Sequence, residues 1–120
     1  MSNAERGYKP LFNGTIANGA TQYVPVPITG GMVGLQVAWK DATSSATITL
    51  EISSYGPTAA PYDAAGSAWE WKDSGVSITG PAGAAAGSIL VNAENVRQRR
   101  ARLKIVAAAD CDIEVLNGLA

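Results

Sequence analysis

Short runs in which apolar and polar residues alternate, separated by turns rich in glycine and proline, constrain this chain more than any other feature. Residues 35–39 read Leu-Gln-Val-Ala-Trp, and residues 46–54 read Ala-Thr-Ile-Thr-Leu-Glu-Ile-Ser-Ser. A period of two is typical of a β-strand that buries one face and exposes the other. We find no convincing 3.6-residue period, and only residues 93–100 are a candidate for a helical turn. The sequence therefore predicts an all-β fold.

The two runs are predicted to pair as a hairpin across the polar residues 40–45. If Trp39 lies opposite Ile48, one register places six apolar side chains on the same face. These six are Leu35, Val37, Trp39, Ile48, Leu50 and Ile52. The opposite face carries polar side chains, as expected for one sheet of an antiparallel sandwich.

A second hairpin is predicted near the end of the chain, between residues 101–105 and 111–115. The apolar residues of both runs share one face, and Cys111 is expected among them as a buried, unreactive thiol. On the other face, a basic row that includes Arg102 and Lys104 is expected to lie opposite Asp112 and Glu114. Together with Asp110, these acidic residues resemble a metal-ligand string, but surface ion pairs explain them better.

Further short strands are expected at 23–28, 69–71, 76–78 and 89–91. Two prolines in residues 23–28 remove ladder donors, so this strand is predicted at a sheet edge. The total is seven or eight short strands, which indicates a single antiparallel β-sandwich, either jelly-roll or immunoglobulin-like. We assign residues 13–120 to this domain and residues 1–12, of which the first ten are polar and aperiodic, to a flexible N-terminal arm.

The composition argues against an enzyme. The chain has no histidine and one cysteine, so Ser-His-Asp and Cys-His sites are excluded, and no cofactor or metal site is predicted. The net charge is −1, which gives no general attraction to nucleic acid. No apolar run approaches the roughly 20 residues that span a bilayer. We expect neither a nucleic-acid nor a membrane partner.

Two groups of residues are candidates for binding. The concentrated basic segment contains Arg97, Arg99 and Arg100, which we assign to a protein–protein contact or to intramolecular pairing rather than to nucleic acid, because no aromatic residue interleaves with them. The second group is a possible stacking platform for a sugar, near the long loop of residues 54–68. Its members are the aromatic residues Tyr55, Tyr62, Trp69 and Trp71. Core packing is the competing explanation for the two tryptophans.

The order of these elements resembles a known class of protein. Leu-Phe-Asn-Gly-Thr-Ile at 11–16, the runs at 35–39 and 46–54, Trp-Glu-Trp at 69–71, the basic strand at 99–104 and Ile-Glu-Val-Leu-Asn-Gly at 113–118 carry the likeness. Together they resemble the small β-sandwich structural proteins of tailed-bacteriophage virions, especially capsid decoration or cement proteins. The likeness covers most of the chain and rests on strand order, size and Ala/Gly/Thr content.

The resemblance implies a protein without enzymatic activity that is made in the host cytoplasm and becomes part of the virion. It would form a dimer or trimer and bridge subunits of the major capsid protein, or bind another virion protein. The expected contact residues are three apolar anchors within the arm and three arginines: Tyr8, Leu11, Phe12, Arg97, Arg99 and Arg100. The alternative is a carbohydrate- or receptor-binding module of a tail fibre or surface protein, using the four aromatic residues.

Overall fold

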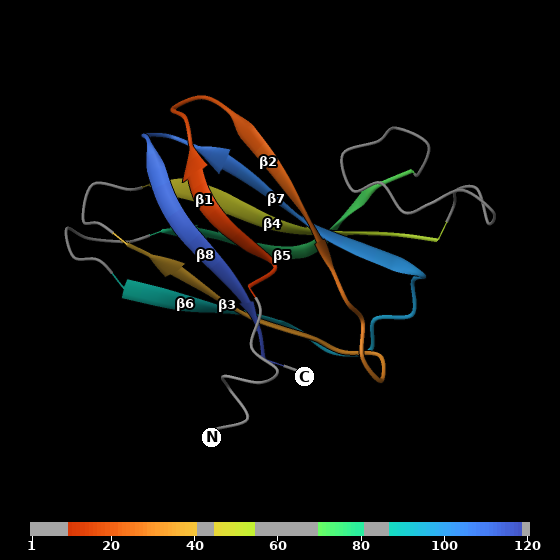
Figure 1. Cartoon of the computed structure of the whole chain (residues 1–120). Helices are drawn as coiled ribbons and strands as arrows, with labels where there is room; N and C mark the ends of the chain where they lie inside the picture. The colour runs from red at the N-terminus through yellow and green to blue at the C-terminus, as the bar shows by residue number, and fades with distance from the viewer. Residues whose placement is uncertain (1–9, 41–44, 55–69, 81–86, 119–120) are drawn as a thin grey trace, which may run out of the picture.

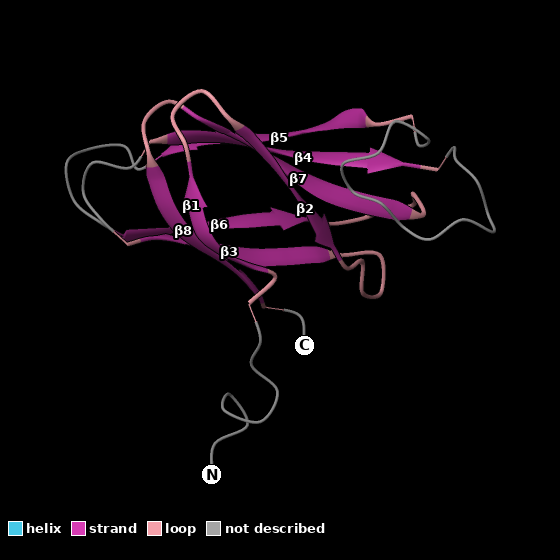
Figure 2. Cartoon of the chain, turned by 45° about the horizontal axis from the view of Figure 1, so that its top comes forward, coloured by secondary structure: helices cyan, strands magenta, loops and turns pink. Residues whose placement is uncertain are grey.

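The computed structural model describes residues 10–40, 45–54, 70–80 and 87–118. Within these ranges the chain forms eight β-strands and no helix, so it has no helix that could cross a membrane. Figures 1 and 2 show the strands as two layers packed face to face. The strands are β1 (Phe12–Ile16), β2 (Thr21–Val26), β3 (Val33–Trp39), β4 (Ala46–Ser53), β5 (Lys72–Gly80), β6 (Gly87–Ala93), β7 (Arg100–Ala107) and β8 (Cys111–Asn117).

Each layer is a four-stranded antiparallel sheet. Sheet A has the order β1-β8-β3-β6, and sheet B has the order β2-β7-β4-β5. The first strand pairs with the last, the second with the seventh, the third with the sixth and the fourth with the fifth. The chain is therefore one long antiparallel ribbon folded over itself, which is the jelly-roll arrangement. The predicted all-β sandwich is confirmed, and of the two topologies left open the jelly roll is the one observed.

Both predicted hairpins are wrong, although the faces assigned to their residues are right. Residues 35–39 lie in β3 of sheet A and residues 46–53 in β4 of sheet B, so the two runs face each other across the interior. Their inward side chains are buried, apart from Ile52, which is half-buried. Likewise β7 and β8 belong to different sheets. Alternation identifies the buried face of a strand but not its partner.

Because β7 and β8 do not pair, the ion pairs predicted between their side chains do not form. Arg102 lies opposite Glu51 on β4 and forms its ion pair there, with 2.7 Å between Nε and Oε1. Asp112 pairs instead with Lys40, at 3.6 Å between Nζ and Oδ1. The basic and acidic rows therefore lie on the outer faces of opposite sheets and do not meet.

The edge strand predicted at 23–28 is confirmed, because β2 is the outer strand of sheet B. The expected strand at 76–78 lies inside β5, and that at 89–91 lies inside β6. Trp71 immediately precedes β5, while Trp69 lies outside the described residues. Residues 94–99 connect β6 to β7 without a helical turn.

The sandwich begins within the segment expected to be an arm. Phe12 is the first residue of β1, and the Leu11 amide donates a 2.8 Å hydrogen bond to the carbonyl of Val115. Both Leu11 and Phe12 pack against the core. Residues 1–9, including Tyr8, lie outside the described residues.

Candidate functional site

A hollow of about 500 Å³ opens where β1, β2 and β7 come together. It contains three of the six residues that the sequence analysis assigned to a contact surface. Its lining consists of Leu11, Pro25, Val26, Pro27, Ile28, Arg99 and Arg100. We call it the proline–arginine hollow.

The strand register explains why these residues meet. Because β2 and β7 are antiparallel, Val26 at the end of β2 lies opposite Ala101 near the start of β7. This places the segment 25–28 beside Arg99 and Arg100, which are distant in sequence. Leu11 is brought near by β1, since the edges formed by β1 and β2 lie on the same side of the sandwich.

The hollow combines an apolar wall with cationic side chains. Prolines 25 and 27 are exposed, Leu11 and Ile28 are half-buried, and Val26 is buried. Arg99 is exposed and Arg100 is half-buried, and both make other polar interactions within the molecule. Such a surface accepts an apolar side chain together with a carboxylate, which a guanidinium binds through two parallel hydrogen bonds.

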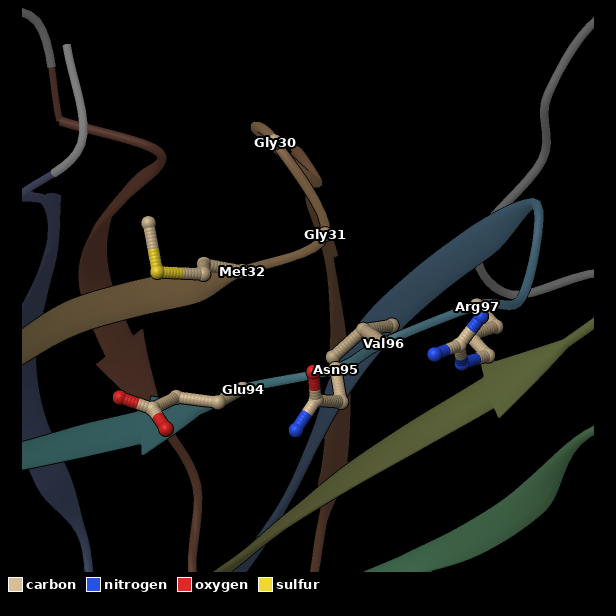
Figure 3. A pocket seen from close by; sticks show the side chains of 7 residues that line it. All are labelled: Gly30, Gly31, Met32, Glu94, Asn95, Val96 and Arg97. Atoms are coloured by element: carbon tan, nitrogen blue, oxygen red, sulfur yellow. The ribbon is translucent and has the colours of Figure 1, made fainter.

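Two further predicted contact residues, Phe12 and Arg97, lie elsewhere. Phe12 packs against the core and does not line the hollow. Arg97 lines a second hollow of about 390 Å³, shown in Figure 3, which lies between the β2–β3 and β6–β7 connections. The structure therefore brings together Leu11, Arg99 and Arg100 and separates Arg97 from them.

The second hollow has a mixed character. Figure 3 shows Glu94 and Arg97 at opposite ends, with the exposed Met32 above them. The amide of Val96 donates a 2.8 Å hydrogen bond to the Gly31 carbonyl and joins the two connections. One carboxylate, one guanidinium that stays protonated and one thioether do not form a constellation for acid–base or nucleophilic chemistry.

Trp71, which belongs to the alternative sugar platform, is half-buried and stacked on a cation. The guanidinium carbon of Arg102 lies 4.4 Å from the Trp71 ring centre and 4.0 Å from that of Tyr23. Since Arg102 already covers these rings, they offer less surface for stacking on a sugar. Tyr55, Tyr62 and Trp69 lie outside the described residues.

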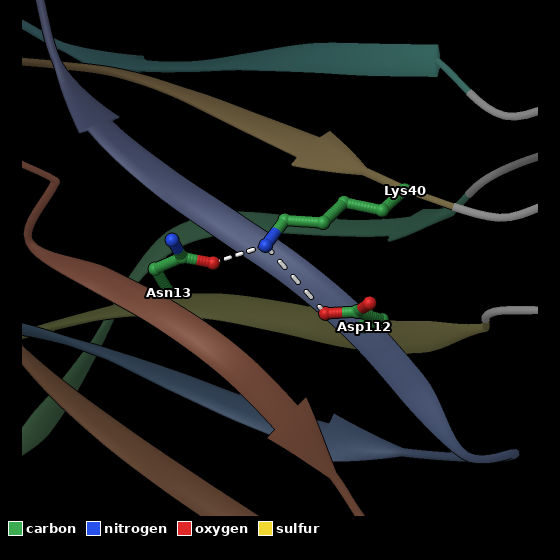
Figure 4. A network of polar contacts seen from close by, with 3 residues as sticks. All are labelled: Asn13, Lys40 and Asp112. Atoms are coloured by element: carbon green, nitrogen blue, oxygen red, sulfur yellow. Dashed lines mark hydrogen bonds and ion pairs between the residues drawn. The ribbon is translucent and has the colours of Figure 1, made fainter.

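The outer face of sheet A carries a polar network, drawn in Figure 4. Lys40, which follows β3, donates to the Asn13 side chain on β1 and approaches Asp112 on β8. Asp110 accepts a 2.8 Å hydrogen bond from the Asn18 amide. Asp110 and Asp112 of the acidic string thus contact polar groups of the same chain, and the described residues include no group of three His, Cys, Asp or Glu side chains that could hold a metal ion.

Cys111 is fully buried, as predicted for an unreactive thiol. Its Sγ donates to the carbonyl oxygen of Ser45, at 2.9 Å. With no histidine in the chain, neither the thiol nor any hydroxyl has an imidazole to act as its base.

Sequence reasoning missed the apolar wall of the proline–arginine hollow. The sequence pattern of residues 25–28 indicates only an edge strand, and it is the pairing of β2 with β7 that places these residues beside the arginines.

When the chain is compared with known proteins, no family model matches it and no curated protein resembles it in sequence.

Proposed function

We propose that this chain is a non-enzymatic structural protein of a virion, a capsid decoration or cement protein that binds coat subunits and stabilises the shell. One observation carries the proposal: Leu11, Arg99 and Arg100, expected as contacts to a coat subunit, line the same hollow. The jelly roll is compatible with it, since viral capsid domains and lectins share this architecture. Because a fold alone does not determine function, the hollow bears the argument.

The chemistry of the hollow defines the partner segment. Its apolar wall is built from residues 25–28 and Leu11, and its basic part from Arg99 and Arg100. A coat-protein segment that presents an apolar side chain next to an aspartate or glutamate fits both. Only an assembled shell offers many such segments at fixed spacing, so stabilisation of the shell follows from mass action.

Co-sedimentation with coat shells tests the proposal. Empty shells are assembled from the major capsid protein encoded in the same genome, mixed with the purified chain and pelleted. We expect the chain to pellet with the shells and to raise their melting temperature. The double variant Arg99→Glu/Arg100→Glu should bind about tenfold more weakly, because it repels the partner's carboxylate.

Arg97→Glu is the control for a charge reversal outside the proline–arginine hollow, since it reverses one arginine of the other hollow. It should bind shells like the unmodified chain. Failure of the unmodified chain to pellet would contradict the proposal, and so would an equal loss in both variants. If the chain binds immobilised glycans and does not bind shells, the result supports the carbohydrate-binding alternative instead.

A further inference from the structure

β6 is an edge strand without the features that usually prevent an edge from pairing with another chain. Within the described residues it pairs only with β3, in an unbroken register from Val33 opposite Ala93 to Trp39 opposite Gly87. Figure 1 shows it as the outer strand of sheet A. Its seven residues include no proline and no charged side chain. Long, regular and uncharged edges are the ones that accept a further strand.

The other three described edges carry such protection. β2 contains Pro25, which lacks an N–H donor. β5 has a register shift against β4 and begins with the exposed, charged Lys72 and Asp73. β1 is only five residues long. The contrast singles out β6 as the edge available for association.

The sequence of β6 is self-complementary about its central residue, Leu90. Ile89 and Val91 flank it, and both are apolar and β-branched; Ile89 is half-buried and Val91 is buried. The next residues outward, Ser88 and Asn92, are both polar and exposed. The strand ends are the small residues Gly87 and Ala93. Read in either direction, the strand therefore presents the same order of chemical types.

We propose that two copies of this chain pair antiparallel through β6, about a two-fold axis that passes beside Leu90. Ile89 of each copy then lies opposite Val91 of the other, and Ser88 lies opposite Asn92. The two A sheets join into one continuous eight-stranded sheet. An isologous contact of this kind needs a self-complementary surface, which β6 supplies.

The exposure of Leu90 supports this pairing. Leu90 is 61% exposed, the highest value among the exposed large hydrophobic residues of the described chain. On the two-fold axis the two Leu90 side chains come directly opposite each other and remove apolar surface from water. No charge on either strand opposes the approach.

The proposed dimer leaves the proline–arginine hollow open. β6 and β5 form one side of the sandwich, whereas β1 and β2, which border the hollow, form the other. A dimer joined through β6 carries two hollows facing away from the joint. The inference does not depend on the proposed virion function, and the two can fail separately.

Light scattering over a range of concentrations, together with a cysteine cross-link, tests the dimer. We expect the unmodified chain to reach twice its monomer mass, and Leu90→Lys to stay monomeric because it places two ammonium groups face to face. Val106→Lys is the matched control: Val106 is an exposed strand residue on β7, inside sheet B. It should dimerise like the unmodified chain.

Leu90→Cys locates the axis. Directly opposed residues of antiparallel strands have Cα atoms about 4.5–5.5 Å apart, within the range of a disulfide. We expect Leu90→Cys to form a covalent dimer under mild oxidation, while Gln36→Cys, on the adjacent strand β3, does not. An unmodified chain that stays monomeric at every concentration overturns the proposal, as does a dimer that persists in Leu90→Lys.

Discussion

Arg102 and Glu51 lie directly opposite each other on β7 and β4, with Arg102 Nε 2.7 Å from Glu51 Oε1. The guanidinium also lies over the rings of Tyr23 and Trp71. Although Arg102 is on the outer face of sheet B, it is only 7% exposed. A charge so far removed from water requires a counter-charge and hydrogen bonds. This cluster therefore links β2, β7 and β4 with the residue that precedes β5.

Removing the carboxylate from this pair should destabilise the fold. Glu51→Gln removes the negative charge that lies 2.7 Å from the buried guanidinium, and we expect the free energy of unfolding to fall by about 2 kcal/mol. Urea unfolding followed by circular dichroism measures the change. The matched control is Glu70→Gln, whose ion pair with Lys72 joins exposed side chains. Its effect should stay within about 0.5 kcal/mol. Equal midpoints for both variants would contradict a stabilising role for the Glu51 pair.

The inward and outward faces of the strands could be predicted from sequence because they depend only on local alternation. Leu35, Val37 and Leu50 are buried as expected, and the prolines of β2 correctly indicated an edge. Strand partners could not be predicted, because pairing depends on how the whole ribbon folds over. Two runs separated by a short polar segment favour a hairpin on local grounds, whereas here the two runs belong to different sheets.

Residues of the candidate site could be predicted where their own side chains identified them, but not where strand pairing brings them to the site. Arg99 and Arg100 were identified by their charge, and Leu11 as the first large apolar residue of the chain. The wall formed by Pro25–Ile28 was missed, because it joins the arginines only through the pairing of β2 with β7. The predicted ion pair of Arg102 with the acids of β8 is wrong because β7 pairs with β4 and lies in the other sheet from β8.

The register of β4 and β5 predicts an engineered disulfide. Thr47 and Thr79 lie directly opposite each other, and their hydroxyl oxygens are 3.2 Å apart. We expect Thr47→Cys/Thr79→Cys to form a disulfide on air oxidation and to stabilise the fold by about 3 kcal/mol. Free-thiol titration and urea unfolding with and without reductant measure both effects. Thr47→Cys/Ser77→Cys, a diagonal pair, should remain reduced; cross-linking in that variant alone would show that the register is shifted.

Cys111 should report on unfolding. Its thiol is fully buried and contacts the Ser45 carbonyl, so a water-soluble thiol reagent can reach it only when the sandwich opens. We expect negligible labelling in buffer and complete labelling above the urea midpoint. Cys111→Ala should lower stability by about 1 kcal/mol because it removes a well-packed side chain. Rapid labelling of the folded chain would show that the strand carrying Cys111 opens locally.

The prolines of β2 should keep the second side of the sandwich from associating. Pro25 lies in β2, opposite Arg102 on β7, and Pro27 directly follows β2. Because proline has no N–H, neither residue can donate a hydrogen bond to an approaching chain. We expect Pro25→Thr/Pro27→Thr to self-associate at concentrations where the unmodified edge does not, because threonine restores both donors and favours a strand. Leu90→Lys is added to block pairing through β6, so that any increase in light scattering reports on β2. In the same background Pro10→Thr restores a donor outside the strands and should scatter like the parent. If the variant Pro25→Thr/Pro27→Thr also scatters like the parent, the prolines do not protect this edge. Its resistance to pairing must then come from the side chains around the proline–arginine hollow.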